Sequence, residues 1–596
     1  MVKRQNRFYV LCGIAVCVVI IYIIRLAYLQ LGPHDYSENA NSNAFFNNVL
    51  YPSRGLIYDR NGKLLVYNQA AYDVMVVMRD VKDLDTLDFC QTLGISRRQF
   101  NNRINLIKDT RKNPGYSSYT QQLFLAQIPI EDYSILQEKL FRFKGFSVRK
   151  RTVRQYNYNI GGHILGDVAE VSSSDIDKDD YYRAGDYIGK QGVERSYEKE
   201  LRGEKGVEIL LRDARGRLVG HYQNGECDEV PHPGKDLTLT IDQELQAYGE
   251  RLMAGRTGSI VAIEPTTGEI LCSVSAPSYT PSDLAGKGRG MRIMKMSQDP
   301  RHPLLNRAVS GVYPPGSTFK PAQALTFLQE RVINRNTSYP CTNGFHYRGM
   351  KLGCHYHPSP LNVTSALATS CNSFFCWGLY HMLGSRSRYT SLDEAMNRWR
   401  DYMVSMGFGY RLGVDLPGEA RGMIPNAEYY GRHYPHWNPL TVVSISIGQG
   451  EVSLTPLQIA NLGATIANRG YYITPHIVKR VHGGHVADSL LVRHSTMVDP
   501  MYYDIVVAGM REAVVAGTCK LANNPEFEVC GKTGTAQNKG IDHSVFVGFA
   551  PRRNPKIAIS VYVENGGQGA TVAVPLARQM IDKYMDLVSK KQDKLQ

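Results

Sequence analysis

The stretch GVYPPGSTFKP, residues 311–321, decides how the rest of this sequence is interpreted. It places Ser317 and Lys320 three residues apart, immediately after a Pro-Pro-Gly turn. In a helix, residues three apart lie on one face, so a hydroxyl and an amine would meet there. A serine hydroxyl is a weak nucleophile and needs an adjacent base. The stretch therefore predicts an activated serine at the start of a helix, provided that the chain supplies the rest of a site.

Two further short motifs follow the first one in the sequence, and their order supports a catalytic interpretation of it. The second is Ser370-Cys371-Asn372 in LATSCNSFF, and the third is Lys532-Thr533-Gly534-Thr535 in CGKTGTAQ. Each motif alone is common. Taken singly, Ser317 would be a helix cap, Lys320 a solvated lysine and Gly534 part of a turn. Together, in this order and within the length of one domain, they resemble the penicillin-recognising serine enzymes.

The chemistry of such a site explains why these residue types occur together. Lys320 can be the base for Ser317 only if burial or a nearby positive charge lowers its pKa, and Lys532 would be that neighbour. Ser370 would pass a proton to the leaving amine, and Asn372 would hold the peptide carbonyl of the substrate. These five residues are the predicted catalytic group.

The Lys-Thr-Gly motif is expected to bind substrate along the edge of a strand. Thr533 and Thr535 offer hydroxyls to a terminal carboxylate, whose charge Lys532 would balance. Gly534 leaves room for the substrate because it has no side chain. The backbone N–H groups of Ser317 and Thr535 would form the oxyanion hole.

Longer stretches narrow the resemblance to one family. RGLIYDRNG, GVERSYEKELRGEKG, GVYPPGSTFKPAQAL, SIGQGEVSLTPLQIAN and VCGKTGTAQ are similar to segments of class B penicillin-binding proteins. The resemblance is weakest over residues 72–150. It implies a monofunctional peptidoglycan D,D-transpeptidase that cross-links stem peptides through an acyl-serine and is inhibited by β-lactams. It also implies a SEDS-family glycan polymerase and rod-shape complex proteins as partners.

The fold expected from these patterns is α+β. GSIVAIEPTTGEILCSVS reads as a hairpin, and EVCGKTGTAQ, SVFVGFAP and KIAISVYVE read as three strands near the other end of the domain. The resemblance implies that they form an antiparallel five-stranded sheet with helices, behind a mixed pedestal domain. The expected parts are a cytoplasmic tip and transmembrane anchor (1–31), a non-catalytic, dimerisation-like pedestal (32–235), the transpeptidase domain (236–585) and a charged, frayed tail (586–596).

The N-terminus indicates the compartment. Lys3, Arg4 and Arg7 precede an uncharged run over residues 8–24, which RLAYLQL extends to residue 31. At about 1.5 Å per residue this segment crosses a hydrocarbon core, and the basic residues predict a cytoplasmic start and an exported body. The family resemblance implies that this body is periplasmic. A cleavable signal peptide is the alternative, but the run is long and no small-x-small cleavage site follows. We therefore expect a single-pass inner-membrane protein.

Four of the eleven cysteines crowd into residues 341–376. Cys341, Cys354, His357 and Cys371 have the spacing C-x12-C-x2-H-x13-C, which suits a closed tetrahedral zinc site. His355 is an alternative to His357 as a ligand. A Cys341–Cys354 disulfide is the rival to zinc, since an exported domain permits disulfides. Similar ligand sets occur in the elongation transpeptidases of the family, which favours zinc and that role.

Composition and motifs leave few other functions open. The net charge is +14, but no run of five or six basic residues appears, which argues against nucleic-acid binding. The basic excess suits anionic lipid or polymer, although an ordinary soluble surface explains it equally. The alternatives are a D,D-carboxypeptidase or β-lactamase, in which water replaces the amine acceptor, a β-lactam-sensing relative, and a division-specific transpeptidase.

Overall fold

The computed structural model describes residues 2–31, 45–111, 113, 116–183, 185–212, 218–286 and 288–595. The chain divides into two compact units, Met1–Ser53 with Gly203–Pro233, and Arg54–Arg202 with Gly234–Gln596. Each unit is described by itself.

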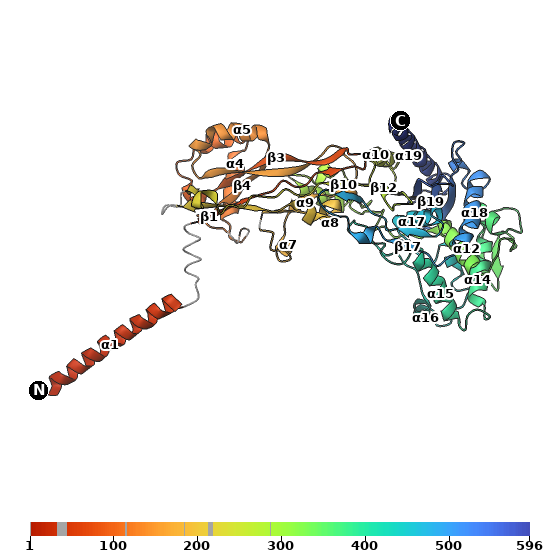
Figure 1. Cartoon of the computed structure of the whole chain (residues 1–596), viewed down its shortest axis with the longest axis horizontal. Helices are drawn as coiled ribbons and strands as arrows, with labels where there is room; N and C mark the ends of the chain where they lie inside the picture. The colour runs from red at the N-terminus through yellow and green to blue at the C-terminus, as the bar shows by residue number, and fades with distance from the viewer. Residues whose placement is uncertain are drawn as a thin grey trace. The chain divides into compact units, whose positions relative to one another are not determined.

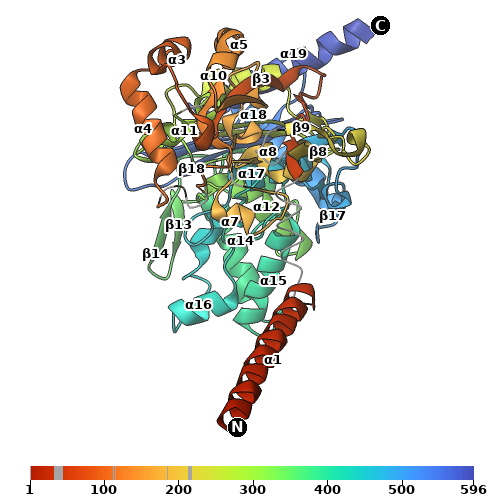
Figure 2. The same cartoon turned by 90° about the vertical axis from the view of Figure 1, so that its left-hand side faces the viewer.

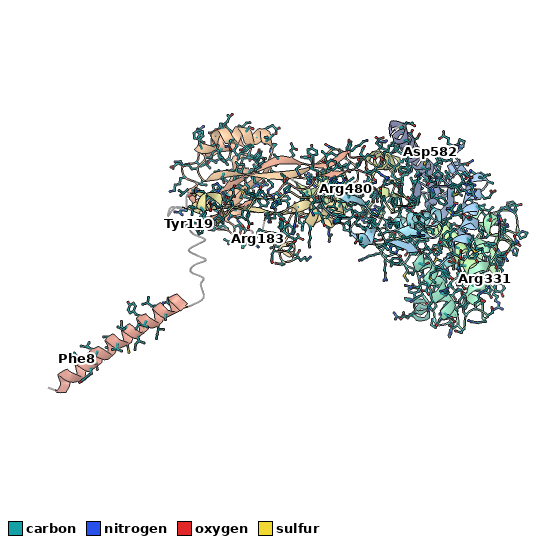
Figure 3. All side chains as sticks on the ribbon, in the orientation of Figure 1. Phe8, Tyr119, Arg183, Arg331, Arg480 and Asp582 are labelled. Carbon is teal, nitrogen blue, oxygen red and sulfur yellow. The ribbon has the colours of Figure 1, made fainter. Side chains whose placement is uncertain are left out.

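The first unit holds the apolar segment and a small sheet. Helix α1 (Val2–Leu31) contains a 20-residue stretch, Phe8–Ala27, with a mean hydropathy of 2.7 and no buried part. Figure 3 labels Phe8 on this helix. Its length and composition are compatible with a single membrane span. Strands β1 (Phe45–Leu50), β8 (Gly206–Arg212) and β9 (Leu218–His221) form an antiparallel sheet in the order β1-β8-β9.

The pedestal part of the second unit is built on a six-stranded sheet. Its order is β16-β10-β2-β3-β4, with β5 also paired to β3. The strands are β2 (Ile57–Tyr58), β3 (Leu64–Val76), β4 (Gln122–Ile128), β5 (Phe146–Tyr156), β10 (Leu237–Leu239) and β16 (Val478–Val481). A turn at residues 60–62 joins β2 to β3. Because β10 and β16 come from beyond residue 235, this sheet continues across the boundary expected from the sequence.

Helices fill the remainder of the pedestal. Helix α4 contributes Phe100, which packs with Phe89 and Phe124 in a separate core that also includes Phe146. The pedestal helices are α3 (Thr86–Thr92), α4 (Arg97–Lys108), α5 (Ile130–Lys139), α6 (Gly162–Leu165), α7 (Ser173–Ile176), α8 (Gly192–Ser196) and α9 (Glu198–Arg202). Strands β6 (Val168–Glu170) and β7 (Tyr187–Gly189) pair beside them.

The transpeptidase part contains the five-stranded sheet expected from the sequence. Its order is β12-β11-β20-β19-β18, and all four pairings are antiparallel. The strands are β11 (Gly258–Ile263), β12 (Ile270–Ala276), β18 (Cys530–Ala536), β19 (His543–Ala550) and β20 (Ile557–Val563). The sheet therefore joins the two ends of the domain, and the edge strand β18 carries the Lys-Thr-Gly motif.

Helices cover both faces of this sheet because its strands alternate between two apolar cores. Ile260, Ile559 and Val561 face a core with α10 and α19, whereas Val261 and Tyr562 face the core that holds α12, α14 and α17. Figure 1 shows α14, α15 and α16 gathered beside α12. The helices are α10 (Gln243–Leu252), α11 (Arg289–Ser297), α12 (Lys320–Gln329), α13 (Val363–Ala368), α14 (Asn372–Gly384), α15 (Leu392–Ser405), α16 (Ala427–His433), α17 (Pro456–Ala467), α18 (Tyr503–Val515) and α19 (Ala573–Leu595). Short strand pairs join β13 (Gly344–Tyr347) to β14 (Met350–Gly353) and β15 (Tyr471–Ile473) to β17 (Arg493–Ser495).

The C-terminal end differs from the expectation. Residues 586–595 are not a frayed tail but the last turns of α19. The apolar residues Leu587 and Val588 pack against the core beneath the helix, and Lys590 pairs with Asp586 one turn away. These contacts extend a helix that the charged composition of SKKQDKLQ had suggested would end earlier.

Candidate active site

Ser317 lies in a single 3-10 turn, Gly316–Phe319, that leads directly into α12. Gly316 has φ +54°, and its N–H donates to the carbonyl of Gly448 at 2.9 Å. A Cβ atom on Gly448 would lie 2.2 Å from the Gly316 carbonyl oxygen, so only glycine fits there. The Thr318 hydroxyl donates to the Pro315 carbonyl at 2.6 Å. One distant loop, at Gly448, and the adjoining Pro315 thus hold the nucleophile turn, with Ser317 itself half-buried at its surface.

Lys320 reaches the second motif. Its Nζ is fully buried and donates to the Ser370 carbonyl (2.7 Å), the Ser370 Oγ (3.3 Å) and the Asn372 Oδ1 (2.7 Å). Burial lowers the pKa of Lys320 to about 8, since the charged amine loses its hydration. Among the described residues, Ser317 Oγ is not a hydrogen-bond partner of this amine. The structure therefore brings the first two motifs together through Lys320.

Lys532 supplies the neighbouring charge that the sequence suggested. It lies on β18, is fully buried, and donates to the Thr533 carbonyl at 3.0 Å. Burial, and then the positive charge of Lys320, lower the pKa of Lys532 to about 7. Two amines with lowered pKa values share this site, which is the arrangement that lets a lysine act as a base near neutral pH.

The edge strand packs closely on the nucleophile turn. A Cβ atom on Gly534 would meet the Pro315 carbonyl oxygen and Thr318 Cγ2, both at 3.0 Å. The space at Gly534 thus serves the contact between β18 and the turn, whereas the sequence had suggested room for substrate. The Thr533 hydroxyl bonds to that of Thr518 at 2.8 Å, and the Thr535 hydroxyl accepts from the Gly569 N–H at 3.4 Å.

The second motif is held in an unusual conformation. Ser370 has φ +58°, which is uncommon outside glycine and costs backbone energy. The Asn372 amide donates to the Gly353 carbonyl at 2.7 Å, while its oxygen accepts from Lys320. One of its two amide hydrogens is therefore already used within the protein. The expected contact of Asn372 with a substrate carbonyl therefore requires the second amide hydrogen, or a movement of the Gly353 carbonyl at the end of β14 that releases the first.

The cysteine cluster lies directly behind the second motif. One ligand atom from each of Cys341, Cys354, His357 and Cys371 lies within 4.8 Å of all the others. All eleven cysteines are free thiols, so Cys341 and Cys354 form no disulfide in this structure. A hydrogen bond from the Cys371 thiol, followed by contacts with His355, the Asn372 N–H and His357, lowers the pKa of Cys354. The group has the size and the donors of a metal site, and His357 rather than His355 belongs to it.

Contacts around the cluster orient its ligand atoms. The backbone N–H of Asn372 donates to Cys354 Sγ at 3.3 Å, and that of Phe374 donates to Cys371 Sγ at 3.4 Å. His357 Nδ1 lies 2.8 Å from the Pro358 carbonyl, and its Nε2 faces the cluster, 3.4 Å from Cys354 Sγ. The cluster is thus connected directly to the second motif, because Cys371 lies between Ser370 and Asn372 in the chain.

Sequence reasoning missed several residues that build the site. Gly448, Thr518 and Gly569 each support a motif residue, yet none belongs to a motif. The only signal for Gly448 was the glycine pair in SIGQGE, which appeared in the resemblance and not in the chemistry. The Ser446 hydroxyl, two residues earlier, points to the Cys376 sulfur at 3.6 Å on α14. The segment 446–448 therefore contacts both the nucleophile turn, through Gly448, and α14, which begins at Asn372 of the second motif.

Comparisons with known proteins agree with this arrangement. The model of the penicillin binding protein transpeptidase domain matches residues 258–582, and that of the penicillin-binding protein dimerisation domain matches residues 49–239. The peptidoglycan D,D-transpeptidase MrdA of Acinetobacter baumannii is 33% identical over 98% of this chain and 88% of its own length. The Escherichia coli K12 MrdA is 29% identical over 92% of this chain and 89% of its own.

Solved structures of similar proteins have the same fold. PBP2 of Helicobacter pylori, in complex with MreC, superposes with a TM-score of 0.77 at 25% identity, covering 91% of this chain and 99% of that one. PBP2 of Pseudomonas aeruginosa superposes with a TM-score of 0.68 at 28% identity, covering 90% and 96%. Both domain models, the five-stranded sheet and the three assembled motifs lead to one conclusion. The chain belongs to the class B penicillin-binding proteins, as a peptidoglycan D,D-transpeptidase of the MrdA (PBP2) type.

Proposed function

We propose that Ser317 is the residue acylated in the transpeptidase reaction. Its Oγ attacks the carbonyl of the penultimate D-Ala of a donor stem peptide, and Lys320 accepts the proton. The tetrahedral intermediate collapses, the terminal D-Ala leaves as an amine that takes up a proton, and an acyl-serine ester remains. An amine of a second stem peptide then attacks this ester, which forms the cross-link and restores the Ser317 hydroxyl.

The observation that carries this proposal is the environment of the Lys320 amine. It is fully buried, lies within hydrogen-bond distance of Ser370 Oγ, and has a pKa lowered to about 8. This contact supports Ser370 as the group that relays a proton between Lys320 and the leaving amine. Lys532, when charged, balances the terminal carboxylate of the donor together with the Thr533 and Thr535 hydroxyls. The N–H groups of Ser317 and Thr535 supply the oxyanion hole.

The biological role proposed is cell-wall elongation and maintenance of cell shape. The similar PBP2 of Helicobacter pylori has been solved with MreC, and another similar chain belongs to a structure of a peptidoglycan synthase complex that coordinates polymerisation and cross-linking. These likenesses support a scaffold protein of the rod-shape complex and a SEDS-family polymerase as partners here. A division-specific transpeptidase is the alternative role.

A structural zinc ion is proposed for the cysteine cluster. Three thiols and one imidazole with mutual distances below 4.8 Å fit tetrahedral coordination, and the backbone donors to two of the sulfurs fit thiolates. Cys341, Cys354, His357 and Cys371 would hold the ion. When bound, it supplies a cross-link and no reaction chemistry. The residues around it keep Ser370 and Asn372 in place against Lys320.

The membrane topology follows from α1. Its apolar stretch would span the inner membrane once, with the short basic N-terminus in the cytoplasm and the catalytic domain in the periplasm. A cysteine-accessibility assay on intact cells, with a cysteine introduced at Ser385 in a Cys227→Ser background that lacks this exposed thiol, tests the orientation. Labelling by a membrane-impermeant maleimide after outer-membrane permeabilisation supports it, whereas protection until the inner membrane is opened would contradict it.

The function is tested on the full-length protein in detergent. We expect fluorescent penicillin to form a stable adduct that is absent in Ser317→Ala, and a donor stem peptide with an amine acceptor to give a cross-linked product detectable by mass spectrometry. Rapid release of hydrolysed penicillin would indicate a β-lactamase. Release of D-Ala without a cross-link in the presence of acceptor would indicate a carboxypeptidase. An adduct without turnover of stem peptide would indicate a sensor.

A further inference from the structure

A second, basic pocket lies away from Ser317 and the cysteine cluster. It is a cavity of about 230 Å³ lined by residues of α15, of α16 and of the segment that connects them. Helices α15 and α16 lie side by side in both views (Figures 1 and 2). Four basic side chains line the pocket: Arg400, Arg421, Arg432 and His433. None of the roles derived above for the motifs uses this pocket.

The charge in the pocket is only partly compensated. Arg432 pairs with Glu428 on the same helix, with both side chains largely exposed. Among the described residues, Arg400 and Arg421 make no ion pair. Glu428 is the only acidic side chain lining the cavity, so the lining carries a net positive charge even with His433 neutral. Unpaired guanidinium groups around a cavity are suited to bind an oxyanion, most of all a carboxylate or phosphate in bidentate geometry.

Buried hydrogen bonds fix the walls of the pocket. The fully buried Gln458 amide donates to the carbonyls of Tyr410 and Arg421, both at 3.0 Å, and thereby ties two lining loops to α17. Gly422 has φ +67°, and a Cβ atom there would lie 2.8 Å from the Gln458 amide oxygen. The Asn397 oxygen accepts from the Ala427 N–H at 3.1 Å, which ties α15 to the start of α16. The pocket is thus held in shape before any ligand arrives.

The pocket is connected to the segment that carries the nucleophile. Met423 in its lining pairs with Ser453 through two backbone hydrogen bonds, of 2.7 and 3.0 Å. The adjacent Leu454 pairs in the same way with Tyr313, four residues before Ser317. Neighbouring extended segments lie about 4.8 Å apart, so two such steps place the pocket about 10 Å to the side of Tyr313. A ligand in the pocket would therefore lie beside the active site and outside it.

We propose that this pocket binds a carboxylate of a peptidoglycan stem peptide other than the acyl donor. Stem peptides are the anionic chains that the transpeptidase reaction brings to this part of the protein, and two of them must be held at once. The cavity accommodates a short side chain that ends in a carboxylate, and Arg400 of α15 and Arg421 of the loop before α16 bind this group. Its function is to hold the second strand beside the cleft while Ser317 carries the acyl group.

The test uses full-length protein in detergent, acylated beforehand by penicillin so that the catalytic cleft is filled. The probe is a disaccharide tetrapeptide muropeptide, which has free carboxylates but no terminal D-Ala-D-Ala, and calorimetry measures its Kd. We expect Arg400→Gln/Arg421→Gln to weaken binding about tenfold or more, and amidation of the muropeptide carboxylates to have the same effect. Arg421→Gln alone changes only an exposed side chain, so it keeps the test valid if the double variant does not fold.

The matched control is Arg480→Gln, which removes an exposed arginine on β16, labelled in Figure 3. It should bind the muropeptide as wild type does. Equal affinity of wild type and the double variant would overturn the proposal. Inorganic phosphate is titrated in parallel: arginine-dependent binding of phosphate without binding of the muropeptide would assign the pocket to a phosphate ligand instead and also overturn it. Either result would leave the acylation of Ser317 unaffected, because the two sites are measured separately.

Discussion

At the scale of single residues, Lys320 is the group on which the proposed chemistry depends. Lys320→Met keeps most of the buried volume and removes the amine. We expect the rate of acylation by fluorescent penicillin to fall by about 10²–10⁴-fold, the usual contribution of a general base. The control is Lys351→Met on β14, an exposed lysine outside the site, which should acylate at the wild-type rate. A loss of less than about tenfold in Lys320→Met would mean that another group accepts the proton.

The lowered pKa of Lys320 also predicts a pH dependence. The amine accepts a proton only when neutral, and its neutral fraction rises as the pH increases through about 8. The acylation rate should therefore climb between about pH 7 and 9 and level off only above that range. Lys532, with a pKa of about 7, shares the site. The apparent pKa of the profile therefore describes the titration of both lysines together and not that of Lys320 alone. Stopped-flow acylation kinetics measure the profile, and a rate that is flat over this range would rule out a lysine base.

At the scale of elements, the contact between the Gly448 loop and the nucleophile turn is the feature most sensitive to change. Gly448→Ala places a Cβ atom 2.2 Å from the Gly316 carbonyl, so the loop or the turn must move. We expect at least a tenfold slower acylation of the folded protein, because Ser317 shifts with the turn. Gly483→Ala has a similar positive φ with open space around it and is the matched control. It should cost about 1 kcal/mol of stability and leave acylation unchanged.

The cysteine cluster is the second element with a testable consequence. Removal of metal by a chelator, without reductant, should lower the melting temperature and slow acylation by about tenfold, since Ser370 and Asn372 lose their support. Metal analysis should give one zinc per chain, lost in Cys341→Ser and retained in Cys227→Ser, whose thiol is exposed elsewhere. If a reductant alone reproduces the effect of the chelator, a disulfide and not a metal holds the segment.

At the scale of the whole molecule, a buried ion network holds the pedestal together. Glu194 on α8 is fully buried between Arg54 and Arg154, with N–O distances of 2.5 and 2.7 Å, and Arg54 also pairs with Glu198 at 2.6 Å. The four residues of the network lie up to 144 positions apart in the sequence. The network therefore joins segments that the chain itself does not connect.

Breaking this network should destabilise the pedestal strongly. Glu194→Gln leaves two buried guanidinium groups without their shared carboxylate, and we expect the free energy of unfolding to fall by about 3–5 kcal/mol. Asp586→Asn removes an exposed pair with Lys590 and should change it by less than about 1 kcal/mol. Chemical denaturation followed by circular dichroism compares the two variants. Equal midpoints would show that the network contributes specificity of folding and not stability.

Much of the fold could be predicted because its signals are local. The hairpin of β11 and β12, the three strands around the Lys-Thr-Gly motif and helix α4 each follow from apolar periodicity and turn residues. The pairing of β10 with both β2 and β16 could not, because it joins segments about 180 and 240 residues apart whose own patterns are short. The extent of α19 was misjudged for a related reason, since its apolar contacts lie in a core built by the rest of the domain.

The sequence by itself determined the anchor-like apolar helix, the family and the identity of the three motifs. Membrane length, nucleophile activation and carboxylate binding each require particular residue types at fixed spacings. Only the tertiary structure decided that Gly448 and Gly534 close around the nucleophile turn, that His357 rather than His355 joins the three cysteines, and that Arg400 and Arg421 share a pocket. These depend on distances between segments far apart in the chain, which are set by packing around the common core and leave no trace in local spacing.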